Sequence, residues 1–161
     1  MKYSNEKVRR QDRLLTELES RELLEKGEYG FLSMVDENER PYGIPINYVW
    51  DGVEAIYLHC APVGEKLRCI QAHPEVAFCV VGRTHVVSDK FTTGYESVIL
   101  RGVAHTGLSP EERMQALRLL LSKYSPDDMT VGLKYAEKSF HRTEIVRIDL
   151  QEFSGKCKRV R

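Results

Sequence analysis

The segment with the clearest chemical pattern is residues 56–70, which read IYLHCAPVGEKLRCI. A β-prone run ends near His59, a turn containing Gly64 follows, and Lys66 stands at the start of a helical pattern. Free backbone N–H groups at a helix start, a glycine that lets the backbone approach closely and a lysine ammonium together favour a phosphate. The segment therefore predicts an anion site, although a glycine and a lysine at this spacing are also common in ordinary surface turns.

His59 is the residue of this segment with a case for proton transfer. An unperturbed imidazole has a pKa of about 6.5, so it changes charge at cellular pH. The alternative is a hydrogen-bonded histidine at a strand end, and His73, which precedes Pro74, is interpreted as structural in the same way. The remaining histidines are scattered and do not have the spacing of metal ligands: His85, His105 and His141.

The cysteines indicate buried thiols rather than a metal centre. They form no CxxC pair, and zinc ligands usually come in close pairs. Three of the four have apolar neighbours. They are Cys60, Cys69, Cys79 and Cys157. The sequence therefore predicts no metal site.

Length and charge limit the classes of protein that fit. With 161 residues, 42% of them hydrophobic, the chain can bury one substantial core, so we expect a single domain over residues 1–161. Lys plus Arg and Asp plus Glu number 24 each, which gives no global field for nucleic acid or an anionic membrane. There is no apolar run of about 20 residues, and the first 25 residues are too charged for a signal peptide. We therefore expect a cytoplasmic protein that binds neither nucleic acid nor membranes.

The first half of the chain reads as a helix followed by a β-meander. Thr16 and Glu19 form a capping box, and Gly27 ends the helical pattern. YGFLSMV, PYGIPINYVW and EAIYLHC follow as three strands, with turns at DENER and at Asp51-Gly52. In the second strand the residues at period two on one face are Ile44, Ile46, Tyr48 and Trp50.

The second half adds strands and two further helices. EVAFCVVG and YESVILRGVAHTG read as strands separated by a polar loop at residues 83–94, with Gly102 as a bulge or bend. Ser109 and Glu112 open a helix, a weaker helical pattern covers residues 133–140, and TEIVRIDLQEF is a last strand before the basic tail GKCKRVR. The apolar stripe of the first of these helices is Met114, Leu117, Leu121 and Tyr124.

These elements favour a closed antiparallel sheet. About six strands are joined by short turns rather than by helical crossovers, and open edges would be costly for apolar strands of this length. We therefore predict a mainly β (α+β) fold, a six-stranded antiparallel split β-barrel with peripheral helices. No GxGxxG follows a strand and no GxxxxGK[ST] is present, so the two commonest parallel-sheet nucleotide sites are absent.

Three blocks in register carry a family resemblance: residues 27–52, 56–82 and 91–105. They begin GEYGFLSMV, IYLHCAPVGEKL and FTTGYESVIL. With them the chain resembles, over roughly residues 27–150, the pyridoxamine 5'-phosphate oxidase-like FMN-binding split-barrel family and, within it, the branch of nitroimidazole-resistance proteins. The resemblance implies that FMN binds at the interface of a homodimer. It also implies a role for individual residues.

By resemblance, the strand under the flavin ring is Pro45, Ile46, Asn47 and Tyr48. The edge beside the ribityl chain and ring is Tyr57, Leu58 and His59, and the phosphate-binding turn contains Gly64 and Lys66. A segment that approaches from the other subunit is Glu96, Ser97 and Val98. Many relatives have Thr or Ser where His59 stands, and a histidine is typical of the nitroimidazole-resistance branch. The residues themselves leave two alternatives open: Asn47 as a partner of backbone groups, and Tyr48 as a core aromatic.

The resemblance implies an FMN-dependent oxidoreductase that reduces a small planar electron-poor acceptor, such as the nitro group of a nitroimidazole. His59 would donate a proton and Lys66 would neutralise the phosphate. The basic tail does not reproduce the substrate-phosphate cluster of the vitamin-B6 oxidases, so pyridoxamine phosphate oxidation is not expected. Two alternatives are a non-catalytic flavin-binding or storage module and a haem-binding split barrel with a histidine on the iron. Neither the electron donor nor the choice between FMN, FAD and a deazaflavin follows from the sequence.

Overall fold

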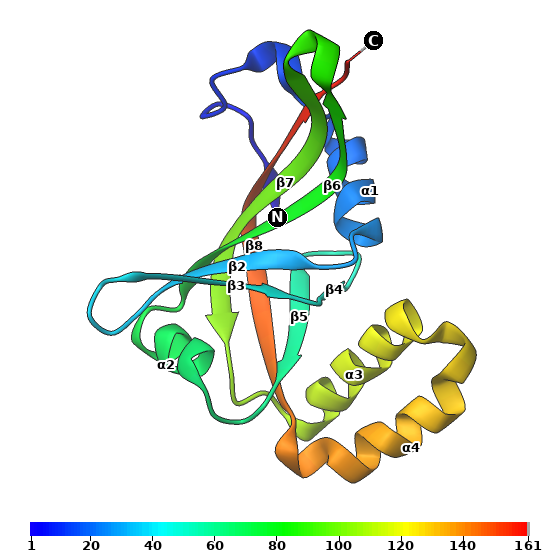
Figure 1. The fold of residues 1–161 in the computed structure, drawn as a ribbon. Helices are drawn as coiled ribbons and strands as arrows, with labels where there is room; N and C mark the ends of the chain where they lie inside the picture. Colours follow the sequence, from blue (N-terminus) through cyan, green and yellow to red (C-terminus); the bar gives the residue numbers. More distant parts are fainter. Residues whose placement is uncertain (161) are drawn as a thin grey trace.

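The computed structural model describes residues 1–160 as an antiparallel sheet with helices around it (Figure 1). The strands are β1 (Lys2–Tyr3), β2 (Gly30–Val35), β3 (Pro41–Ile46), β4 (Val49–Trp50), β5 (Ala55–Cys60), β6 (Glu75–Val87), β7 (Thr92–His105) and β8 (Glu144–Lys158). The α-helices are α1 (Glu17–Lys26), α2 (Glu65–Ala72), α3 (Pro110–Tyr124) and α4 (Met129–Ser139), with single turns of 3-10 helix at Gln11–Arg13, Ser88–Lys90, Pro126–Asp128 and Phe140–Arg142. No helix of residues 1–160 is long and apolar enough to cross a membrane.

The strand order explains why the sheet closes on itself. It runs β3-β2-β6-β7-β8-β5-β4, and β1 adds to β8 in parallel. The two end strands, β3 and β4, are consecutive in the chain and are separated by Asn47 and Tyr48. The sheet must therefore curl until its ends nearly meet, which confirms the antiparallel split barrel. The described strands number eight rather than six because β1, a two-residue strand, is not predicted from the sequence and because β4 is separate from β3, with which it is predicted as one strand.

The prediction of one continuous strand over residues 41–50 is wrong. The strand ends at Ile46 because Tyr124, at the end of α3, takes the backbone hydrogen bonds of Tyr48 that a ladder would use. The Tyr48 N–H donates to the Tyr124 hydroxyl at 3.0 Å, and this hydroxyl lies 2.8 Å from the Tyr48 carbonyl oxygen. A side chain 76 residues away therefore separates β3 from β4.

The predicted polar loop at residues 83–94 is also wrong. The strands β6 and β7 continue through it and form a long arm that extends beyond the barrel (Figure 1), with a register shift between Val81 and Thr84. Most side chains from Arg83 to Val86 are exposed, so the ladder hydrogen bonds, rather than a buried face, hold the strands. The predicted basic tail is likewise part of β8, where Lys156 pairs with Ser97 of β7.

Several local predictions are confirmed. Thr16 and Glu19 form the capping box of α1, and the Ser109 side chain accepts a hydrogen bond from the Glu112 N–H at the start of α3. The register of β7 against β8 shifts between Arg101 and Gly102, where the bulge was expected. The weaker helical pattern is α4, which begins four residues earlier than residue 133.

Two groups of buried side chains form the core. The larger one fills the barrel, and its biggest fully buried members are Tyr48, Phe78 and Phe153. The smaller one joins α3 and α4 to the outside of the barrel and consists of Val49, Ala116, Leu117, Leu120, Ala136 and Ile145. The α3–α4 hairpin therefore packs against the outside of the barrel near β5 and is not part of the barrel.

Candidate functional site

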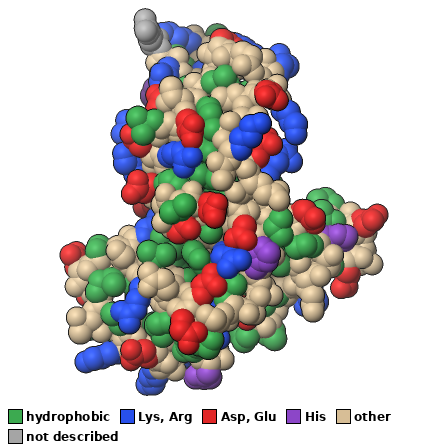
Figure 2. All heavy atoms as spheres, turned by 180° about the vertical axis from the view of Figure 1, so that it is seen from behind, with side chains coloured by type: hydrophobic (Ala, Val, Ile, Leu, Met, Phe, Trp, Pro, Cys, Tyr) green, Lys and Arg blue, Asp and Glu red, His purple; other side chains and the backbone are tan. Residues whose placement is uncertain are grey.

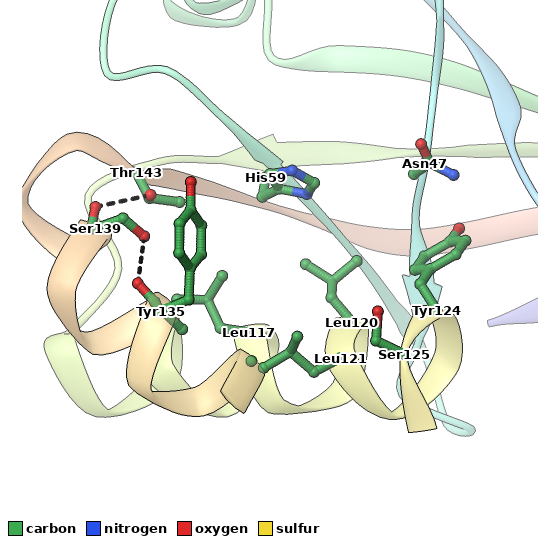
Figure 3. A pocket seen from close by; sticks show the side chains of 12 residues that line it. Asn47, His59, Leu117, Leu120, Leu121, Tyr124, Ser125, Tyr135, Ser139 and Thr143 are labelled. Carbon is green, nitrogen blue, oxygen red and sulfur yellow. Dashed lines mark hydrogen bonds between the residues drawn. The ribbon is translucent and has the colours of Figure 1, made fainter. Parts of the chain in front are cut away.

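A cavity of about 380 Å³ lies between the α3–α4 hairpin and the barrel (Figure 3). Two residues expected at the cofactor, Asn47 and His59, line it. Its other lining residues are Leu117, Leu120, Leu121, Tyr124, Ser125, Gly132, Tyr135, Ala136, Ser139 and Thr143. In Figure 3 the leucines of α3 lie along one side, Tyr135 rises from α4, and the His59 ring lies across from the leucines. The fold therefore brings the candidate catalytic histidine to an apolar hollow.

The position of His59 follows from the alternation of β5. Leu58 points into the barrel core with no exposed surface, so His59, one residue later, points to the outer face. Partial burial lowers the pKa of His59 from its ordinary value, and the nearby Lys66 ammonium lowers it further. The imidazole is therefore mostly neutral at pH 7 in the free protein.

The turn after β5 has the features of an anion site. Gly64, the residue before α2, has φ +150°, and a Cβ there would meet no atom within 4 Å, so the backbone is open to an approaching group. The first helical hydrogen bond runs from the Arg68 N–H to the Gly64 oxygen, which leaves the preceding amides free of helical partners. Lys66 is half-buried, and its ammonium opposes the rise in the Cys60 pKa that burial causes. The acidic Glu65, in the first turn of α2, and Glu144, which pairs with Cys60, disfavour an anion.

The end of β3 forms a second hollow that shares Asn47 and Tyr124 with the cavity. It has a volume of about 620 Å³ and includes Pro45 and Ile46. The Asn47 Nδ2 donates to the Glu28 carbonyl oxygen at 3.0 Å, so this amide does satisfy a backbone group while its Oδ1 stays available. The two hollows together extend from the end of β3, which is expected from the sequence to lie under the flavin ring, to the α3–α4 hairpin.

Tyr48 and Leu58 are placed differently from their neighbours, because both side chains are fully buried. The Tyr48 hydroxyl donates to the Leu24 carbonyl oxygen, and the ring lies 3.9 Å from the Lys123 ammonium. Burial lowers the pKa of this Lys123 to about 8. Only the backbone of Tyr48 and Leu58 is left to contact a cofactor.

The Tyr57 side chain faces a different polar group of residues. Its hydroxyl donates to the Glu112 carboxylate at 3.1 Å, and Arg147 donates to the same oxygen at 2.8 Å. Burial, followed by the contact with Glu112, raises the pKa of Tyr57 to about 12. Tyr57 thus ties β5 to the start of α3 and lies outside the residues that line the cavity.

Within one chain the fold does not bring Glu96, Ser97 and Val98 to His59. They pair with Cys157, Lys156 and Gly155 of β8, whereas His59 pairs with Ile145. Ten residues of strand separate Ile145 from Gly155, which is roughly 33 Å at about 3.3 Å per residue. This segment therefore lies far from the cavity of its own chain.

The sequence reasoning missed the cavity residues of α3 and α4. From the sequence, Leu117, Leu121 and Tyr124 are predicted only as part of an apolar helix stripe and are given no place in the site. Leu117 is buried, but Leu121 is only half-buried and Tyr124 is 37% exposed. A stripe that runs past the buried patch is the signal that could have indicated a lined cavity.

Comparisons with known proteins identify the family. A family model described as pyridoxamine 5'-phosphate oxidase matches residues 16–157, and no curated protein matches. A crystal structure of a candidate 5-nitroimidazole antibiotic resistance protein from Bacteroides thetaiotaomicron is similar, with 19% identity, a TM-score of 0.76 and coverage of 90% of this chain and 86% of that one. The FAD binding protein from Mycobacterium smegmatis is 23% identical, with a TM-score of 0.63 and coverage of 92% of this chain and 99% of that one. The haem storage protein HutZ from Vibrio cholerae is 17% identical, with a TM-score of 0.65 and coverage of 88% of this chain and 93% of that one.

Identities below 25% show the fold alone, and all three structures share it with this chain. The family model carries more weight because it spans nearly the whole sheet and all four α-helices. The chain therefore belongs to the pyridoxamine 5'-phosphate oxidase-like split-barrel family, whose members bind flavin.

Proposed function

We propose that the chain is a single-domain FMN-dependent oxidoreductase of the nitroimidazole-resistance type, which reduces a small planar electron-poor acceptor. The observation that carries the proposal is the position of His59. It lies between an open glycine–lysine turn suited to a phosphate and a cavity without a fixed charge. The end of β5 thus lies beside both the proposed phosphate turn and a cavity for the substrate.

The residues fit FMN at both of its ends. Gly64, the free amides at the start of α2 and Lys66 suit the phosphate, since they offer N–H groups and a positive charge at an open backbone. The outer edge of β3 at Pro45 and Ile46 and the free Oδ1 of Asn47 suit the ring and its polar atoms. Bound there, the flavin would supply the electron pair that the acceptor takes up.

The protein's own part in the reaction is positioning and proton transfer. Reduction of a nitro group to a nitroso group consumes two electrons and two protons and releases water, so a proton donor must lie beside the acceptor. His59 is the titratable imidazole that faces the cavity. Lys66 lowers the pKa of His59 in the free protein, and a phosphate on Lys66 would offset that charge and return the pKa toward its ordinary value.

A second copy of the chain would complete the site. On the outer face of the sheet, Pro45, Phe31, Cys79 and Ile99 are adjacent in register across β3, β2, β6 and β7. Phe31 and Ile99 are 45% and 46% exposed, and Val81 beside them is 57% exposed. Such an apolar row fits a homodimer interface. In that dimer the partner subunit's Ser97 would approach the flavin.

Charge on the surface agrees with a small-molecule enzyme. On the face shown in Figure 2, acidic and basic side chains are interspersed, with hydrophobic ones between them. The equal totals of the two signs, 24 each, are thus also mixed in space on this face. A surface of this kind offers no broad basic field to a polyanion.

The test of the proposal is a titration of the purified chain with FMN, FAD and haemin, followed by absorbance and flavin fluorescence. We expect FMN to bind, and Lys66→Ala to weaken it by about 1.5–3 kcal/mol, the range for a hydrogen bond to a charged group. Lys134→Ala, an exposed lysine of α4, is the control and should leave the affinity unchanged. A colourless protein that takes up no FMN would exclude the flavin function.

Catalysis is tested separately from binding. His59→Ala should keep FMN bound and slow acceptor reduction by about 10²–10⁴-fold, the usual contribution of a general acid. His141→Ala, an exposed histidine outside the cavity, is the control. Equal single-turnover rates for the wild type and both variants would remove His59 from the mechanism. FMN binding without turnover would favour the storage module, and a Soret band that His59→Ala abolishes would favour the haem protein.

A further inference from the structure

The α3–α4 cavity has a composition that selects for one kind of ligand. Its apolar side is made by Leu117, Leu120, Leu121 and Ala136. No Lys, Arg, Asp or Glu of residues 1–160 lines it. A charged ligand would therefore lose its hydration without gaining a partner, which is costly, whereas an uncharged ring would not.

Hydrogen-bond donors gather on the opposite side of the cavity. The Ser139 hydroxyl donates to the Tyr135 carbonyl oxygen at 2.8 Å, and the Thr143 hydroxyl donates to the Ser139 carbonyl oxygen at 3.0 Å, so both protons are already used. Among residues 1–160 the Tyr135 hydroxyl has no partner, and in Figure 3 it points toward the side on which His59 lies. The tyrosine O–H and the imidazole N–H are thus two donors available to a ligand on this side, which would have to present acceptor oxygens to them. The Ser125 hydroxyl and the second Nδ2 proton of Asn47 are further donors in the cavity lining.

The size of the cavity suits one or two rings. A dry cavity of about 150 Å³ lined by apolar side chains holds a benzene molecule. The volume of about 380 Å³ here leaves room for a substituted ring system but not for the flavin as well. The helices are set at this separation by Gly132, where a Cβ would lie 2.6 Å from the Leu121 Cδ2.

From these features we infer that the α3–α4 cavity is the acceptor pocket, and that it takes an uncharged aromatic ring carrying an oxygen acceptor, of the nitroarene or quinone class. The ring packs on Leu117 and Leu121, and its oxygens accept from Tyr135 and His59. Tyr135 is then a specificity residue. The inference rests on the proposed function only in naming this ligand the electron acceptor, since binding itself needs no electron transfer.

The experiment compares nitrobenzene with benzoate, which has the same shape but a negative charge, by calorimetric titration of the full chain with and without FMN. We expect nitrobenzene to bind at least tenfold more tightly than benzoate. Tyr135→Phe should weaken nitrobenzene by roughly threefold to tenfold, the value of one hydrogen bond, and leave an unsubstituted ring such as benzene unaffected. Equal affinities for nitrobenzene and benzoate would overturn the inference.

Two filling variants locate the binding. Ala136→Leu, which adds bulk inside the cavity, should reduce nitrobenzene affinity at least tenfold, and Glu137→Leu, which adds the same bulk on the exposed face of α4, should not. Leu121→Phe fills the same space from α3 and serves as the second variant should Ala136→Leu fail to fold by circular dichroism. Unchanged affinity in a folded filling variant would overturn the inference.

The same titrations separate this inference from the proposed function. Binding of nitrobenzene at the cavity by a chain that takes up no FMN would support the pocket and refute the flavin enzyme. Tight FMN binding with no nitrobenzene binding, or with nitrobenzene binding insensitive to Ala136→Leu, would refute the pocket alone.

Discussion

The two ends of the candidate site are built in opposite ways. The end that we propose for the phosphate, called the phosphate end, is the turn at Gly64 and the start of α2. It is exposed, carries the Lys66 charge and comes from one short stretch of chain. The cavity end is apolar, has no fixed charge among its lining residues, and draws on β5, the β3–β4 link, α3 and α4. His59 lies where they meet.

This difference teaches that affinity and selectivity are separable in this fold. A charged turn can hold an anion whatever is bound in the cavity, because Coulomb attraction needs little shape complementarity. An apolar cavity discriminates by shape and by the absence of charge, so it depends on how α3 and α4 pack. Changes at one end should therefore leave the other end largely intact.

The largest expected effect would break the separation of the two ends. Ile99→Glu puts a charge into the apolar row that we propose as the dimer interface, which should weaken association by about 3–5 kcal/mol because the charge is buried without a partner. The protein should become monomeric in analytical ultracentrifugation and lose FMN affinity together with acceptor reduction. Val53→Glu, at a valine 67% exposed in the turn after β4, is the control. A monomeric variant with full FMN affinity would contradict the shared site.

The next effect concerns Tyr124, which lines both the cavity and the hollow at the end of β3. Tyr124→Phe removes the hydroxyl that accepts from the Tyr48 N–H and donates its one proton to the Tyr48 or Glu28 carbonyl oxygen. The unpaired backbone groups should lower the free energy of unfolding by about 2 kcal/mol, measured by urea denaturation. Tyr135→Phe, which removes a hydroxyl without a partner in residues 1–160, should leave stability unchanged. Equal stabilities of the two variants would show that Tyr124 does not hold the break between β3 and β4.

A smaller effect is expected at the phosphate end. Gly64 has a backbone conformation, φ +150° and ψ 168°, that side chains with a Cβ rarely adopt. Gly64→Ala should therefore lower the free energy of unfolding by about 1–2 kcal/mol and also weaken the binding of FMN, with nitrobenzene binding unchanged. Val63→Ala, at the exposed neighbour, is the control. No loss of stability would mean that the turn adopts another conformation in solution.

The smallest effect is a shift in one pKa. Replacing Lys66 by Met removes a positive charge that lowers the pKa of His59, so the pKa should rise while remaining below its ordinary value because the partial burial stays. An NMR titration of the imidazole measures it, with Lys134→Met as the control. Because the pKa of His59 is lower in the folded chain than in the unfolded chain, the unfolded chain binds a proton at His59 at a higher pH than the folded chain does. His59 therefore makes folding less stable as pH falls below about 6.5, and a fall in its pKa in Lys66→Met would contradict the charge coupling.

Elements fixed by neighbouring residues could be predicted from the sequence. The cap of α1 joins Thr16 to Glu19, the cap of α3 joins Ser109 to Glu112, and the turn that we propose as the phosphate site needs only Gly64 and Lys66 near a helix start. In each case the interacting groups are at most a few residues apart, so the pattern contains the interaction. The assignment of that turn to FMN came from the family resemblance and not from the physics of the turn.

Tertiary structure alone decided the rest. The arm of β6 and β7 has no buried face along residues 83–86, so its strands are held by backbone hydrogen bonds. The sequence there has no alternation of apolar and polar residues that would indicate a strand. The break between β3 and β4 depends on Tyr124, 76 residues from Tyr48. The cavity depends on how α3 and α4 meet at Leu121 and Gly132 beside His59. The residue types were visible in the sequence, but which of them meet is set by the packing of distant segments, and that packing turns an apolar stripe into a pocket.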